Sequence, residues 1–173
     1  MPPTTPLKII VSGPGGVGKT TLLLRYQTGE YHPAKTTIGV NFVTQQVDTV
    51  SGLVILSIWD YAGEERFKAL FPGYCSGSSG GFAVFDMSRP DTLNMLSDWI
   101  EIIFEKNELI PVLLVGTKKD AVSPEQLEYV SEKAREFATD HSLKGFYLVS
   151  SQTGEGIPEL FDALANAVLE TIR

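Results

Sequence analysis

Cysteine, long apolar runs and positive charge are all scarce in this chain of 173 residues. Cys75 is the single cysteine, so a disulfide framework and a cysteine-based metal site are excluded, and a reducing, cytoplasmic location is expected. The longest apolar stretches, such as residues 53–59, fall well short of the roughly 20 residues that a membrane span needs. Residues 1–6 lack the basic and apolar regions of a signal peptide, and we interpret them as a flexible N-terminal tail.

The charge balance and the histidines argue against two further classes of protein. The 14 Lys and Arg residues are outnumbered by 21 Asp and Glu residues, and the net charge of −7 disfavours binding of nucleic acid through a basic face. His32 and His141 stand far apart without cysteine neighbours, which argues against a histidine-based metal site. Hydrophobic residues make up 43% of the chain, so residues 7–173 are predicted to form one domain with a sizeable core.

Apolar runs alternate with helical patterns along the chain. The runs predict six strands, at residues 8–11, 42–50, 53–60, 82–85, 112–115 and 146–149. Ser51-Gly52 predicts a tight hairpin turn between the second and third strands. Helical spacing is found at residues 19–26, at 93–104, after a Ser123 cap and in a final stripe at 160–172. This alternation predicts an α/β fold with a six-stranded, mostly parallel sheet, one antiparallel edge strand and about five helices.

A phosphate-binding loop follows the first predicted strand. Residues 13–20 match the pattern G-x-x-x-x-G-K-[ST] and lie between a strand and a helix, as the motif requires. Its glycines allow backbone N–H groups to surround a phosphate, and the positive end of the following helix faces that charge. Lys19 would bind the terminal phosphates and the Thr20 hydroxyl would bind Mg²⁺. The sequence therefore predicts nucleoside triphosphate binding in a three-layer P-loop NTPase fold.

Two acidic residues indicate which metal and which base would bind. Asp60 ends an apolar strand, where its carboxylate can hold Mg²⁺ through water. Asp120 follows another apolar strand, where Lys118-Lys119-Asp120 taken in isolation is more typical of an ordinary surface turn. In a nucleotide site its carboxylate would accept hydrogen bonds from N1–H and the exocyclic amine of guanine. Adenine lacks that pair of donors and would leave the carboxylate unpaired, so guanine is favoured.

Four segments together resemble the Ras superfamily of small GTPases, and its Rab-like branch most closely. They are the phosphate loop, residues 36–42, residues 59–67, and residues 117–120 together with 150–152. The segments occur in the family's order and at about its spacing, so the resemblance covers nearly the whole chain and identifies residues 7–173 as a G domain. One departure is a spacing between Thr20 and Thr37 that is one residue shorter than is typical of Rab proteins.

The resemblance implies a role for individual residues. Gly63 would bind the γ-phosphate through its backbone N–H, and Thr37 would join Thr20 and Asp60 at Mg²⁺. Lys118 and Tyr31 would cover the two faces of the base. The implied nucleotide-binding set is Gly13, Gly15, Gly16, Val17, Gly18, Lys19, Thr20, Thr21, Tyr31, Thr37, Gly63, Thr117, Lys118, Asp120, Ser150, Ser151 and Gln152. The catalytic set is Glu64, Lys19, Thr37 and Gly63.

The catalytic position departs from the family. Glu64 stands where relatives carry the glutamine that orients the attacking water. A carboxylate can accept a hydrogen bond from water, but it cannot donate one and it brings negative charge near an anionic transition state. Thr117, Gln152 and Tyr61 also replace the usual Asn, Lys and Thr.

The leading hypothesis is a Mg²⁺-dependent switch that binds guanine nucleotide, hydrolyses GTP to GDP and acts in membrane traffic or signalling. Exchange factors, an activating protein and effectors are the expected partners of a monomer. Two alternatives are a GTP-binding interaction module with little turnover, and an ATP-dependent P-loop kinase, which Asp120 disfavours.

No cysteine follows Cys75, so no lipid anchor is expected, and membrane association would need a missing tail or a partner. Trp59, Phe42 and Tyr74 fit core packing and an exposed effector surface equally well.

Overall fold

The structure, a computed structural model, describes residues 6–34, 37 and 39–172. The expected N-terminal tail, apart from Pro6, lies outside the described residues, as do Thr36 and Ile38 of the second family segment. Within the described part of the chain, no helix is long and apolar enough to cross a membrane.

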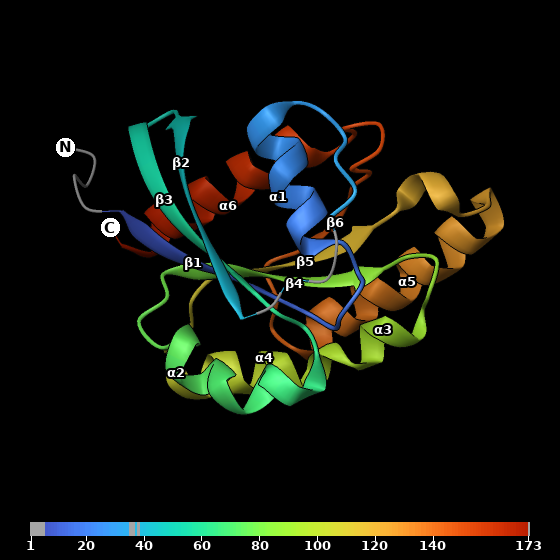
Figure 1. Ribbon diagram of the computed structural model, residues 1–173, viewed down its shortest axis with the longest axis horizontal. Coiled ribbons are helices and arrows are strands. Elements are labelled where there is room, and N and C mark those ends of the chain that lie inside the picture. Colours follow the sequence, from blue (N-terminus) through green and yellow to red (C-terminus); the bar gives the residue numbers. More distant parts are fainter. Residues whose placement is uncertain (1–5, 35–36, 38, 173) are drawn as a thin grey trace.

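The described strands form one sheet of six (Figure 1). They are β1 Leu7–Ser12, β2 Val40–Thr49, β3 Gly52–Tyr61, β4 Gly80–Asp86, β5 Val112–Thr117 and β6 Phe146–Leu148. Their order is β2-β3-β1-β4-β5-β6. Only the β2–β3 pair is antiparallel, with Val40 opposite Tyr61, and every other neighbouring pair is parallel. The predicted fold class is confirmed, including the antiparallel edge strand.

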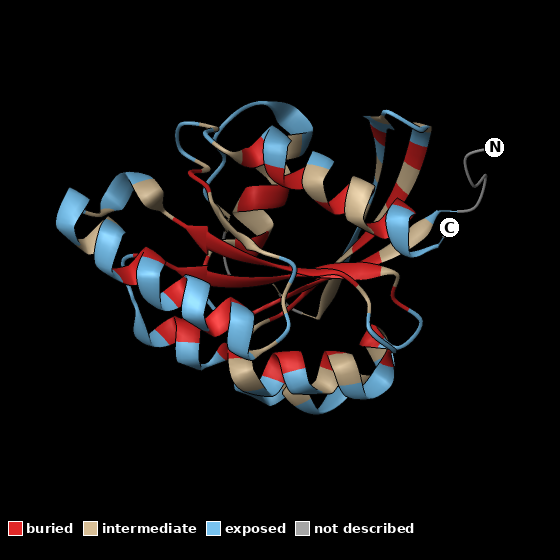
Figure 2. Ribbon diagram, turned by 180° about the vertical axis from the view of Figure 1, so that it is seen from behind, coloured by how far each residue is buried: buried red, intermediate tan, exposed pale blue. Residues whose placement is uncertain are grey.

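Helices cover both faces of the sheet, which gives three layers (Figures 1 and 2). The helices are α1 Lys19–Thr28, α2 Phe71–Cys75, α3 Asp91–Asn94, α4 Leu96–Lys106, α5 Pro124–Asp140 and α6 Ile157–Thr171. Two 3₁₀ turns accompany them, η1 Glu65–Leu70 and η2 Lys119–Ala121. Only Met95 separates α3 from α4, so together they act as a single bent helix and the predicted number of about five holds.

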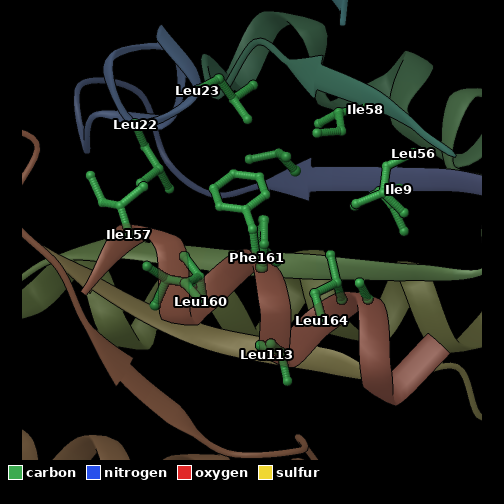
Figure 3. Close-up of a cluster of buried hydrophobic side chains, with 14 of the residues drawn as sticks. Ile9, Leu22, Leu23, Leu56, Ile58, Leu113, Ile157, Leu160, Phe161 and Leu164 are labelled. Atoms are coloured by element: carbon green, nitrogen blue, oxygen red, sulfur yellow. The ribbon is translucent and has the colours of Figure 1, made fainter. Parts of the chain in front are cut away.

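Each face of the sheet has its own apolar core because side chains alternate along a strand. In β1, Ile9 and Val11 point toward α1 and α6, whereas Ile10 points toward α2–α5. On the first face Phe161 of α6 lies within this core (Figure 3). Its ring packs edge-on against Phe82, with ring centroids 5.2 Å apart. The two cores fix the strand ends, and therefore the loops that follow them.

Three sequence interpretations need correction. Thr49 pairs with Gly52, so the hairpin turn is Val50-Ser51 rather than Ser51-Gly52. Gly52 has a φ of +114°, which a residue with a Cβ rarely adopts. The sequence pattern places Ile172 in the buried stripe of the last helix, but α6 ends at Thr171 and Ile172 is 50% exposed. The segment before β4 folds into η1 and α2, neither of which the pattern predicts.

Candidate functional site

A cavity of about 470 Å³ opens at the carboxyl ends of β1, β3, β5 and β6. Ligands of open α/β sheets bind at this edge, where the loops after several strands converge. Every residue of the expected nucleotide-binding set lines the cavity except Gly13 and Ser150. Three lining residues are not anticipated from the sequence, namely Pro33, Ala34 and Ala121.

The phosphate loop takes a backbone path that its glycines make possible. Gly13 has a φ of +147°, and a Cβ at that position would lie 2.3 Å from the Val84 carbonyl oxygen. Gly18 has a φ of +96° and caps the N-terminus of α1 in the left-handed conformation. The loop therefore passes close to β4 and ends with the first N–H groups of α1 available to an anion.

Lys19 is held beneath the phosphate loop. Its Nζ donates hydrogen bonds of 2.9 Å to the carbonyl oxygens of Gly13 and Pro14, and the residue is 6% exposed. Burial lowers the pKa of Lys19 to about 8, although the nearby Asp60 carboxylate opposes the shift. A positive charge buried without a fully compensating partner favours an anion in the cavity.

Three oxygen-bearing side chains from three separate segments meet beside Lys19. The Thr20 hydroxyl donates to Asp60 Oδ2 at 2.5 Å and is hydrogen-bonded to the Thr37 hydroxyl. Asp60 Oδ1 is buried and has no hydrogen-bond partner among the described residues. Burial raises the pKa of Asp60, and the Thr20 hydrogen bond and the Lys19 charge oppose that rise. A hard divalent cation with oxygen ligands fits this set, because it would satisfy the unpaired carboxylate oxygen.

The Gly63–Glu64 segment lies against the phosphate loop. A Cβ on Gly63 would lie 2.3 Å from Gly13 O and 2.5 Å from Gly15 N, so the two backbones are in direct contact. A Cβ on Gly15 would lie 3.8 Å from the Glu64 Cγ, which places this carboxylate at the same end of the cavity. Arg66 Nε donates to Glu64 Oε2 at 2.6 Å. The expected catalytic residue is therefore one half of an ion pair.

The opposite end of the cavity carries the residues expected to hold the base. Asp120 Oδ1 accepts a hydrogen bond of 2.6 Å from the Ser150 hydroxyl, so Ser150 orients Asp120 from outside the cavity. The Thr117 hydroxyl lies 2.6 Å from Val17 O and 3.0 Å from Phe85 O. Its single proton serves the protein backbone, so Thr117 braces the phosphate loop. Tyr31 is 44% exposed at the rim.

Asp86 is a buried acidic residue beside the site that the sequence analysis did not single out. It ends β4, is completely buried and forms ion pairs with Lys118 at 2.8 Å and Arg89 at 3.2 Å. Burial alone would raise the pKa of Asp86, but hydrogen bonds from Lys118, Ser88 and Arg89 together lower it. The available signal was an acidic residue at the end of a wholly apolar strand, the same feature that singled out Asp60.

Trp59, Phe42 and Tyr74 combine core packing with surface exposure, the two interpretations that the sequence left open. Trp59 is half-buried, with Lys8 Nζ 3.8 Å from its ring centroid and Tyr74 at 6.2 Å. Phe42 packs edge-on against Trp59 at 4.6 Å, yet it remains 61% exposed. They form a continuous aromatic group on β2, β3 and α2, of which Phe42 is the exposed part.

Comparison with known proteins gives a consistent family. The model of the Ras family matches residues 8–170. Ras-related protein Rab-18-B of Danio rerio is 35% identical over 171 residues, covering 96% of this chain and 81% of that protein. Ras-related protein Rab-18 of Lymnaea stagnalis is 33% identical over 171 residues, covering 96% and 82%.

Proposed function

The chain belongs to the Ras family and is a small GTPase, and from this premise we propose that it is a Mg²⁺-dependent switch. In this proposal residues 7–173 form a G domain that binds GTP, hydrolyses it to GDP and phosphate, and alternates between two loop arrangements. The observation that carries the proposal is the meeting of Thr20, Thr37 and Asp60 beside the buried Lys19. Thr20 belongs to the phosphate-binding motif and Thr37 to one of the loops expected to switch, whereas Asp60 lies near the end of β3, just before the other loop.

Guanine would bind at the end of the cavity formed by Asp120. The Ser150 hydroxyl occupies one oxygen of that carboxylate and fixes its orientation, which leaves the other free for the base. Lys118 is held by Asp86 at 2.8 Å and would lay its aliphatic stem along one face of the base. Backbone groups of Ser151 and Gln152, which line the same end, would lie near O6.

The reaction is an in-line displacement at the γ-phosphorus. The water oxygen forms the new bond, the bond to the β–γ bridging oxygen breaks with its electron pair staying on GDP, and the water protons end on phosphate and solvent. Lys19 and the Gly63 N–H would bind γ-phosphate oxygens, and Glu64 would accept a hydrogen bond from the attacking water. Mg²⁺, held by Thr20, Thr37 and Asp60, would supply charge neutralisation when bound.

A backbone hydrogen bond connects the two loops that are expected to switch. The Ala62 N–H donates to the Gly39 carbonyl at 2.8 Å; Ala62 directly precedes Gly63, and Gly39 comes two residues after Thr37 in the sequence. Contacts from Thr37 and Gly63 to a γ-phosphate would order both loops, and loss of that phosphate would release them together. Exchange factors, an activating protein and effectors would recognise the two arrangements, and exposed Phe42 supports an effector surface there.

A second function is favoured by Glu64 itself. A carboxylate cannot donate a hydrogen bond to the γ-phosphate, and here it is engaged by Arg66. The chain would then be a GTP-loaded interaction module with little turnover. Action in membrane traffic or signalling is proposed for either case, since both relatives named above are Rab-18 proteins.

Single-turnover hydrolysis of preloaded GTP, with ATP as competitor and Asp120→Ala as the control variant, tests the proposal. Phosphate release above the protein-free blank, with GTP preferred over ATP and weakened binding in the control, is expected. Tight GTP binding without release over many hours would support the interaction module. Absence of GTP binding, or equal binding of ATP, would refute both functions.

A further inference from the structure

The Glu64–Arg66 pair lies at the rim of the cavity, at the end where the γ-phosphate is expected. Glu64 lines the cavity next to Gly15 and Gly63, and its side chain is 33% exposed. Arg66 Nε lies 2.6 Å from Glu64 Oε2, while the Arg66 side chain is 66% exposed. Arg66 therefore reaches the carboxylate from the solvent side without blocking the cavity.

The local backbone holds the two side chains together. The Phe67 N–H donates to the Glu64 carbonyl at 3.0 Å, which closes a turn around both members of the pair. The guanidinium carbon of Arg66 also lies 4.7 Å from the centroid of the Phe67 ring. Tyr61, the buried last residue of β3, packs against Phe71 of α2 and donates its hydroxyl to the Phe67 carbonyl. Tyr61 and Glu64, two of the departures from the family pattern, thus act on the same turn.

The pair offers the hydrogen-bonding groups that a glutamine offers. A glutamine side chain combines an acceptor with a donor and carries no charge, whereas an ionised glutamate has acceptors only. An arginine has five N–H donors, of which Arg66 uses Nε–H on Glu64. Its terminal amino groups make no hydrogen bond within the described residues, so they are free to donate to another acceptor at the rim. Together the pair presents acceptor, donor and a net charge of zero.

Other nearby cations are already engaged. Lys68 Nζ lies 2.9 Å from Asp98 and 3.5 Å from Glu65. Arg89 is paired with the buried Asp86. Among the described residues, Arg66 is therefore the cation that neutralises Glu64.

We propose that Arg66 is a charge-compensating residue of this GTPase, and that Glu64 and Arg66 work as one unit in place of the usual glutamine. The inference rests on the proposed function, because it requires a γ-phosphate at this end of the cavity. Arg66 cancels the repulsion between Glu64 and the γ-phosphate and supplies the donor that Glu64 lacks. Without Arg66, Glu64 disfavours GTP relative to GDP, because only GTP brings charge to this end.

An equilibrium double-mutant cycle tests the unit without depending on turnover. The dissociation constants of GDP and of a non-hydrolysable GTP analogue are measured for the parent, Arg66→Ala, Glu64→Gln and the double variant. When Glu64 is present, we expect Arg66→Ala to weaken binding of the analogue relative to GDP by about tenfold. This loss is smaller than for a fully buried donor, because Arg66 is largely exposed. When Arg66→Ala is added to Glu64→Gln, it should change the ratio of the two dissociation constants by less than about twofold.

Two further variants separate charge compensation from a structural role. Lys68→Ala removes the same charge two residues away and should leave the analogue-to-GDP ratio unchanged. Tyr61→Phe removes only the hydroxyl that holds the turn, and should shift the ratio in the same direction as Arg66→Ala but by less. The Arg66 effect should also shrink in 1 M salt, where the Debye length falls to about 3 Å.

The outcomes separate this inference from the proposed function. The paired unit would be overturned, with nucleotide binding intact, if Arg66→Ala changed the analogue-to-GDP ratio equally with and without the Glu64→Gln substitution. It would also be overturned if Arg66→Ala bound the analogue more tightly than the parent. Absence of guanine-nucleotide binding in every protein, the parent included, would refute the proposed function and the unit with it. Where phosphate release is measurable, its rate should fall in Arg66→Ala and change little when Arg66→Ala is added to Glu64→Gln.

Discussion

Replacing Gly63 with alanine would place a methyl group inside the backbone of the phosphate loop. The added carbon would lie 2.3 Å from Gly13 O, 2.4 Å from Pro14 C and 2.5 Å from Gly15 N. Gly63 is not among the glycines with positive φ, so the cost of alanine there is steric rather than conformational. All three neighbours are backbone atoms that no rotamer change can move.

The size of the effect follows from these distances. Restoring ordinary contact, at about 3.4 Å, requires the two backbones to separate by roughly 1.1 Å, and overpacking of this kind costs about 1–3 kcal/mol. In a domain of this size each kcal/mol lowers the melting temperature by about 2–4 °C. The displacement also moves the Gly63 N–H away from the expected γ-phosphate, so the GTP analogue should lose more affinity than GDP.

Thermal melting in GDP and in a non-hydrolysable GTP analogue measures both effects. Gly15→Ala is the matched control, because its Cβ would make only ordinary contacts of 3.8 Å with Glu64 and Gly63. In GDP the control should melt within about 4 °C of the parent, since a compatible Gly-to-Ala change alters stability by less than about 1 kcal/mol. If Gly63→Ala melted with the parent and kept its preference between the two nucleotides, the steric argument would be wrong.

Three more substitutions test other parts of the molecule. Asp86→Asn should lower the free energy of unfolding by about 1–3 kcal/mol at pH 7, because both paired cations are half-exposed. Since the pKa of Asp86 is lowered in the folded protein, the stabilisation by its carboxylate is present above a pH of about 4 and is lost below it, so the melting curves of variant and parent should converge in acid. Thr20→Ala should weaken Mg²⁺ binding at least about tenfold, measured as the Mg²⁺ concentration that slows GDP release, and an unchanged concentration would contradict the proposed ligand set. Phe161→Ala should lower the free energy of unfolding by about 3–5 kcal/mol in urea, and a loss below about 1 kcal/mol would mean that α6 does not anchor its core.

Most of the sheet could be predicted because its signals are local. A strand buried on both faces, such as Val112–Thr117, is a continuous apolar run that no alternative element explains as well. The phosphate loop is likewise carried by one contiguous motif. The predicted Ser123 cap is confirmed, since its hydroxyl accepts from the Gln126 N–H at 3.2 Å.

The elements before β4 could not be predicted because tertiary contacts form them. α2 contains Pro72 and Gly73, both of which lower helix propensity. It is held by burial of Phe71 and Cys75 and by the packing of Phe71 on Trp99 of α4 at 4.8 Å. The prediction for Ile172 is wrong for a related reason, because the helical period continues in the sequence after the helix has ended at Thr171.

Asp86, which the sequence analysis did not single out, acts on neighbouring side chains rather than lining the cavity. Asp86 lines no part of the cavity, yet Lys118, which it holds, donates to the Gly16 carbonyl at 3.2 Å. Arg89, its second partner, lies 3.5 Å from the Gly15 carbonyl. Carbonyls held on the outside of the phosphate loop leave the loop's N–H groups free to face the cavity. One buried carboxylate therefore supports both ends of the cavity, the end expected to bind the base and the end expected to bind phosphates. Asp86→Asn should weaken the binding of inorganic pyrophosphate and of guanosine alike, whereas loss of a residue confined to one end would weaken the binding of only one of them.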